Sequence, residues 1–172
     1  MHRISRRRHA RCRRERGAAL VEFALVFPLL FMLIAGMIDF GMVFSNLNST
    51  RQGVREGARQ AVVAEFGADT TCPVVGVTPA TATKKLMCLT KDRIGLPQTD
   101  TRVKVAFANT NEVGGGILVC AMYPMSSVTG TFAPVLDGRV VTTKVEMRIE
   151  KVDESLTAAA ETALNGDWSW CA

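Results

Sequence analysis

Histidine is nearly absent from this chain of 172 residues. The only two, His2 and His9, lie at the N-terminal end, so residues 18–172 contain none. Nucleophilic catalysis by a Ser-His-Asp or Cys-His arrangement needs an imidazole base, and that part of the chain therefore excludes it. Zinc is disfavoured as well, because neither a histidine nor a C-x-x-C spacing supplies the usual ligands. We expect no catalytic site, no metal and no cofactor.

Charge is absent from Phe23 to Ile38, and no proline follows Pro28 until Pro73. With its apolar flanks this stretch predicts a membrane helix over residues 18–44, of about 27 residues and ~40 Å. That length crosses a hydrocarbon core of ~30 Å. We expect Pro28 either to kink or unwind the helix, or to be tolerated as prolines in membrane helices often are.

Positive charge is confined to the N-terminal end. Residues 1–17 contain eight arginines and one glutamate, a charge of +7, so the formal net charge of +5 leaves −2 for residues 18–172. Arginines beside an apolar segment stay on the cytoplasmic side, and we favour this role over nucleic-acid binding. The sequence therefore predicts a single-pass protein of the cytoplasmic membrane, embedded in the lipid bilayer, with the chain beyond Ser45 outside.

The helix is expected to continue beyond the membrane as a stalk over residues 45–67. Apolar and arginine side chains fall on different helical faces there, and Gly67 is a plausible end for a helix that runs from Ala18 to about Phe66. Small residues at helical spacing form one smooth face, namely Gly53, Gly57 and Ala61. Such a face suits contact between helices, or close packing inside the monomer, which we favour.

Residues 68–172 form the predicted exported domain. A short helix is expected over 80–93, and apolar alternation predicts strands over 101–108 and 140–150. Another strand is expected over 117–123, between a run of three glycines and Pro124. A looser segment with turn residues spans 125–138, and Asp153 is expected to cap a last helix over 154–164. The fold class is α+β: a long transmembrane and stalk helix, with an antiparallel sheet of about three strands and short helices packed on its exported half.

Four of the five cysteines lie on the exported side, where an oxidising compartment favours disulfides. Three pairings of the four are possible. We favour Cys72 with Cys88, which bridges the loop and the short helix, and Cys120 with Cys171, which tethers the C-terminal tail to the sheet.

Two carboxylates border the apolar helix. Glu22 is costly in lipid unless it is paired or lies at headgroup level, and the residues alone do not separate these alternatives. Asp39, near the outer end, is expected at the interface, where its side chain reaches water.

With these residues laid out, the chain resembles the TadE-like minor pilins (pseudopilins) of tight-adherence (Tad/Flp) pilus systems. The resemblance rests mainly on the segment from Arg16 to Leu30, RGAALVEFALVFPLL. It continues through Ile38-Asp39-Phe40-Gly41 and the stalk segment Val54-Arg55-Glu56-Gly57-Ala58-Arg59.

The resemblance implies that a prepilin peptidase removes residues 1–17 between Gly17 and Ala18, and that Glu22 and Phe23 mark this site. It further implies partners: other pilins or pseudopilins, the Tad membrane platform and its secretion ATPase. The alternative is a signal-anchored extracytoplasmic binding domain with no role in a filament.

Overall fold

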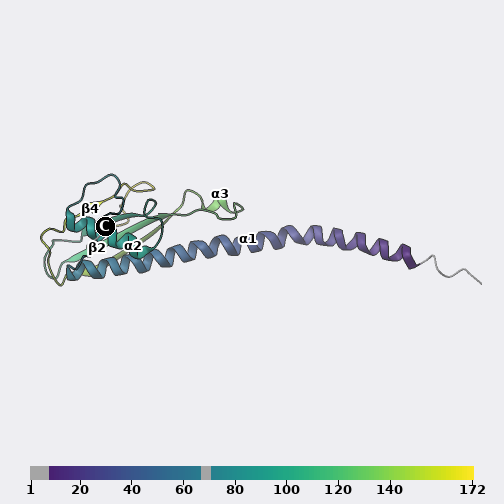
Figure 1. The fold of residues 1–172 in the computed structure, drawn as a ribbon, viewed down its shortest axis with the longest axis horizontal. Coiled ribbons are helices and arrows are strands. Elements are labelled where there is room, and N and C mark those ends of the chain that lie inside the picture. The colour runs from purple at the N-terminus through teal and green to yellow at the C-terminus, as the bar shows by residue number, and fades with distance from the viewer. Residues whose placement is uncertain (1–7, 67–70) are drawn as a thin grey trace, which may run out of the picture.

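One helix, α1 (Arg8–Val63), accounts for 56 residues of the computed structural model, which describes residues 8–66 and 71–172, with side chains from Gly17 onward. At 1.5 Å per residue it is ~84 Å long. One end carries a small α+β domain, and the other projects free of it (Figure 1). Residues 1–7 of the predicted leader lie outside the described residues. The helix begins before the expected start at Ala18, because the leader before Gly17 contains no proline or glycine to stop it.

The stalk end of α1 differs from the prediction. The helix ends at Val63 rather than near Phe66, and Gly67, the expected stop, lies outside the described residues. Ala64 adopts a left-handed conformation with φ of 54°. Two amides from the end of the sheet, those of Glu150 and Lys151, donate to the Val62 carbonyl at 3.1 and 2.9 Å. A tertiary contact thus satisfies a carbonyl that a helix end leaves unpaired.

The sheet has four antiparallel strands in the order β3-β2-β1-β4. They are β1 (Arg102–Phe107), β2 (Gly116–Pro124), β3 (Val140–Arg148) and β4 (Ala159–Ala160). The first three confirm the predicted strands, whereas β4 was not predicted. The last helix expected over 154–164 is wrong, because this segment instead pairs with β1 through β4.

The core lies between one face of the sheet and two helices, α1 and α2 (Thr81–Ile94), which pack on each other (Figure 1). α2 matches the expected short helix and ends at Gly95, whose φ of 68° is left-handed. The buried apolar side chains come from both helices and from alternate strand positions: Val54, Ala58, Leu86, Met87, Val103, Val105, Ile117 and Val119. Because successive strand residues face opposite sides, the period of two in the sequence selects this face.

The two disulfides follow the favoured pairing. Cys72 is joined to Cys88 and Cys120 to Cys171. The second bond attaches the C-terminal tail to β2 from the sheet face opposite the core. Leu118 and Met122, on the same side of β2 as Cys120, are buried as well. Both faces of the central strand are therefore covered.

The connection between β2 and β3 reaches away from the sheet and runs beside α1 toward its bare half (Figure 1). This segment, residues 125–139, is called the 125–139 loop below. It contains one short helix, α3 (Ala133–Leu136). It places part of the α+β domain next to the predicted membrane helix.

Candidate functional site

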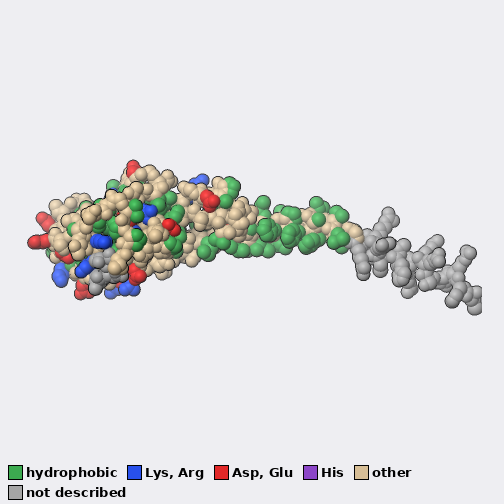
Figure 2. Space-filling model, turned by 45° about the horizontal axis from the view of Figure 1, so that its top comes forward, with side chains coloured by type: hydrophobic (Ala, Val, Ile, Leu, Met, Phe, Trp, Pro, Cys, Tyr) green, Lys and Arg blue, Asp and Glu red, His purple; other side chains and the backbone are tan. Residues whose placement is uncertain are grey.

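The N-terminal half of α1 presents an apolar surface that the rest of the described chain leaves bare. Every residue from 18 to 34 is exposed, and Figure 2 shows hydrophobic side chains all along this part of the helix. In the described part of the chain, α1 from Gly17 to Val63 is the one helix long and apolar enough to span a membrane. Exposed apolar surface of this extent needs lipid or other apolar helices around it.

The predicted processing segment lies at the free end of this surface. Gly17 has open space around it, and Ala18, Glu22 and Phe23 are all exposed. The Phe23 ring lies 5.3 Å from that of Phe27, centroid to centroid. Within the described residues nothing bonds to the Glu22 carboxylate. Within the described residues, Gly17 and the Glu22 side chain are therefore uncovered.

Pro28 does not divide the predicted membrane helix. α1 is continuous through it, and Figure 1 shows a smooth curve rather than a break. An unwound turn, one of the two sequence expectations, is therefore absent from this part of α1. A membrane helix tolerates such a proline when neighbouring groups accommodate the missing hydrogen bond.

Asp39 is placed differently from the prediction. Its side chain does not reach water, since the residue is 0% exposed. Both carboxylate oxygens accept hydrogen bonds from the 125–139 loop. Oδ2 accepts from Ser127 Oγ at 2.7 Å and from Thr129 Oγ1 at 2.8 Å. Oδ1 accepts from the backbone amides of Val128 and Thr129, both at 2.9 Å.

Four donors therefore satisfy a buried carboxylate beside the predicted membrane segment. We call Asp39 with Ser127, Val128 and Thr129 the Asp39 cluster. No sequence pattern predicted this cluster, because the donors lie 88 to 90 residues further along the chain. Buried charge is tolerated only when it is paired or fully hydrogen-bonded, and this loop supplies the bonds.

An aromatic contact supports the same attachment. The Phe132 ring of the loop lies 5.6 Å from that of Phe40, centroid to centroid. It also covers Gly36, where an added Cβ would lie 3.3 Å from the Phe132 ring. The glycine thus permits close approach of the loop to α1 on the turn that precedes Asp39.

The small-residue face of the stalk packs on α2 of the same chain. A Cβ at Gly53 would lie 2.6 Å from Ile94 Cα, and one at Gly57 would lie 3.1 Å from Thr90 Cβ. Ala61, one turn further, is buried. The contact is between two helices, as the spacing indicates, but it holds the domain to its own stalk.

A buried ion pair that sequence reasoning missed joins the domain's segments. Lys91 Nζ lies 2.8 Å from Glu161 Oε1, and both side chains are 0% exposed. The Glu161 carboxylate also accepts from the amides of Val75 and Val103 at 2.9 and 2.7 Å. Burial lowers the pKa of Lys91, against the attraction of Glu161, which raises it. This pair belongs to the architecture of the domain.

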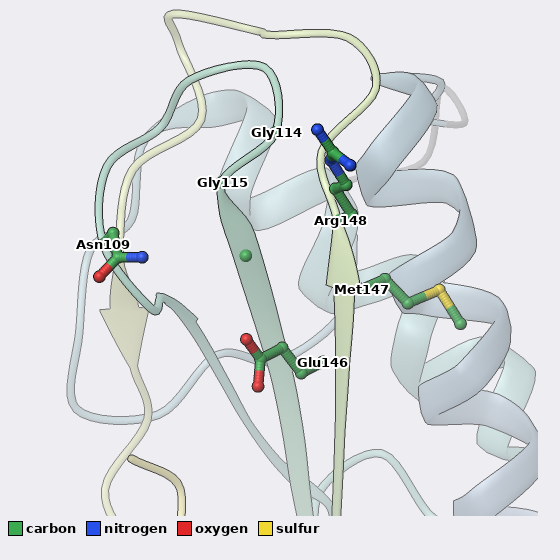
Figure 3. Close-up of a pocket in the computed structure, with 7 residues that line it drawn as sticks. Asn109, Gly114, Gly115, Glu146, Met147 and Arg148 are labelled. Atoms are coloured by element: carbon green, nitrogen blue, oxygen red, sulfur yellow. The ribbon is translucent and has the colours of Figure 1, made fainter.

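A shallow depression lies at the domain's distal end, between the turn Gly114–Gly116 and β3 (Figure 3). Glycine creates the space, since a Cβ at Gly116 would lie 2.6 Å from Glu146 Oε1. The glycine turn leads into β2 and not into a helix, so it lacks the helix N-terminus of a phosphate-binding loop. Met147 faces the helices, and Glu146 and Arg148 are exposed.

Comparison with known proteins identifies one part of the chain. The model of a family described as TadE-like protein matches residues 17–59. No curated protein and no solved structure matches the chain. The matched segment covers the exposed apolar helix, Asp39, and Gly53 and Gly57 of the stalk face under α2. It confirms the resemblance that the sequence motifs indicate.

Proposed function

We propose, from the premise that this chain is a TadE-like protein of the Tad pilus system, that it is a minor pilin or pseudopilin processed by a prepilin peptidase. The role is structural, as a filament component or an assembly and initiation factor, and involves no catalytic step. The domain at the end of the stalk distinguishes the proposed subunit from a pilin made of a helix alone.

The observation that supports the proposal is the exposed apolar surface formed by residues 17–34. This surface is apolar and uncovered, yet it contains one carboxylate, Glu22, with no partner among the described residues. An ionised group in lipid is costly unless it meets an opposite charge. Cleavage after Gly17 would create such a charge, the α-amino group of Ala18, about one helical turn from Glu22.

The proposed sequence of events follows the charge distribution. The arginine-rich leader holds the precursor's N-terminus in the cytoplasm and orients the helix in the bilayer. After the peptidase removes residues 1–17, the Ala18 amine of one subunit and Glu22 of a neighbour guide the docking of helices. The platform and secretion ATPase then act on the assembled helices, and the domain beyond residue 67 faces outward.

The deciding experiment determines the N-terminal residue of the membrane-associated protein. Intact and peptide mass spectrometry would be carried out on protein from cells with and without the prepilin peptidase. A start at Ala18 that depends on the peptidase is expected. A start at Met1, or a cut beyond Ile38, would instead favour an anchored or secreted binding domain.

A second test addresses the role of the carboxylate. Glu22→Gln retains the shape but removes the charge, and we expect it to impair piliation while membrane insertion stays intact. Glu65→Gln is the matched control, because Glu65 is exposed just beyond the far end of α1 and this variant should assemble normally. Normal piliation with Glu22→Gln would contradict the proposed docking mechanism.

A further inference from the structure

The Asp39 cluster fixes the depth of the 125–139 loop relative to the membrane helix. The loop contacts α1 at Gly36, Asp39 and Phe40, whereas the last large exposed apolar residue of the helix is Phe44. Eight residues separate Gly36 from Phe44, or ~12 Å along the helix axis. The tip of the loop therefore lies beside the outer end of the apolar helix surface, below its polar boundary.

The composition of the loop suits that depth. No charged residue occurs from Met125 to Leu136. Val128 and Val135 are 63% and 51% exposed. Figure 2 shows hydrophobic side chains on this projecting part of the domain as well as on the bare helix. Its two charged residues, Asp137 and Arg139, lie at the end that returns to β3.

The backbone N–H groups of the loop are also largely hydrogen-bonded within the protein, as a site with little water requires. Nine of the ten N–H groups between residues 127 and 137 donate hydrogen bonds within the protein. The carboxylates of Asp39 and Asp137 and the hydroxyls of Ser127 and Thr129 accept five of them. Irregular segments ordinarily leave such groups to water, and unsatisfied groups are expensive near lipid.

We propose that the 125–139 loop is a membrane-contact element, which inserts Val128, Val135 and the adjoining face of Phe132 into the outer headgroup and acyl boundary of the bilayer. The inference rests on the proposed placement of α1 in a membrane and adds a second contact with lipid. An amphipathic segment in this boundary is typically buried by ~5–10 Å, in keeping with the reach of the loop. Two attachments, helix and loop, then orient the domain above the bilayer.

Lipid is the favoured occupant because the loop lies next to the proposed membrane helix. The exposed valines belong to a loop that contacts α1 at the outer end of the segment we place in the bilayer, and the loop offers no charge to a protein partner over residues 125–136. The alternative is that a second copy of the chain or another pilin covers the loop. The test below distinguishes such a protein cover from lipid.

The test places one additional tryptophan in the full-length chain, reconstituted in vesicles of phosphatidylethanolamine and phosphatidylglycerol. Val135→Trp reports on the loop. Val113→Trp is the matched control, a valine 69% exposed in the turn between β1 and β2 at the domain's distal end. Phe31→Trp, in the bare helix, reports on the membrane span. The unsubstituted chain gives the background from Trp168 and Trp170.

We expect phosphatidylcholine brominated near the headgroup end of its acyl chains, added to these vesicles, to quench the tryptophan at 135. Phosphatidylcholine brominated near the methyl end of its chains should quench that at 31, and neither lipid should quench that at 113. Quenching at 31 without quenching at 135 would overturn the loop inference and leave the membrane span in place. Absence of quenching at both positions would overturn the span as well. Protection of position 135 from both brominated lipid and aqueous acrylamide would show a protein cover and reject lipid.

Discussion

Thr129 donates two hydrogen bonds to the Asp39 carboxylate, one from its backbone amide at 2.9 Å and one from Oγ1 at 2.8 Å. The two residues are 90 positions apart in the chain. Their contact holds the 125–139 loop against α1 at a point on the N-terminal side of the stalk segment that packs on the domain. The domain is therefore attached to α1 at two levels, by the loop near Asp39 and by α2 near Gly53 and Gly57.

Asp39→Asn should release the loop. The substitution replaces one acceptor oxygen by an amide NH₂, which then faces donors that it cannot satisfy. We expect hydrogen exchange at the Val128 and Thr129 amides to accelerate on the order of tenfold or more, the scale of a lost bond to a charged group. Mass spectrometry of the detergent-solubilised chain measures it. Glu154→Gln, at an exposed site, is the control, and unchanged exchange in Asp39→Asn would contradict this role of the carboxylate.

Gly53→Ala should destabilise the contact between α1 and α2. The added Cβ would lie 2.5 Å from the Ile94 amide nitrogen, so backbone must move. Overpacking of this kind costs about 1–3 kcal/mol in unfolding free energy. Gly41→Ala is the matched control, because its Cβ meets nothing within 4 Å and the gain in helix propensity is the same. Denaturant unfolding of the two variants in detergent compares them, and equal midpoints would refute tight packing at Gly53.

Lys91→Met should be among the most destabilising single changes in the domain. It leaves the buried Glu161 carboxylate with two amide donors and no counter-charge. Breaking a buried pair from one side costs about 3–5 kcal/mol. Arg93→Met, on an exposed position of the same helix, should change the unfolding free energy by less than about 0.5 kcal/mol. Equal effects of the two substitutions in thermal or denaturant unfolding would show that the pair is dispensable.

The two disulfides should contribute unequally. The Cys120–Cys171 bond spans 51 residues and the Cys72–Cys88 bond spans 16. Loop-closure entropy predicts losses of about 4 and about 3 kcal/mol when each pair is replaced by serine. Urea unfolding of the two double variants measures which one loses more unfolding free energy. A larger loss from the shorter loop would indicate that native contacts around Cys72 outweigh the entropy of the unfolded chain.

Local patterns were sufficient for much of this protein. The uncharged run from Phe23 to Ile38 predicts a long apolar helix, and alternation in β1 and β3 assigns their buried faces, whereas β2 is buried on both faces. The motif around Gly17 and Glu22 likewise indicated the family whose model matches residues 17–59. Each of these signals is contained within one short stretch of residues.

Other features depended on partners far along the chain. Residues 154–164 have a helix-like pattern, but Glu161 is drawn to Lys91 and to the amide of Val103, and the segment forms β4 instead. Similarly, α1 ends at Val63, where the end of the sheet supplies donors to Val62.

Asp39 shows most clearly which features follow from local sequence and which depend on the tertiary structure. The sequence by itself determined that a carboxylate stands at the outer end of an apolar helix, where burial without hydrogen bonds is costly. Only the tertiary structure decided how that cost is met, because the donors come from a loop 88 to 90 residues away. Periodicity and local propensity describe one segment at a time, whereas a buried charge is stabilised by whichever segments the whole fold brings to it.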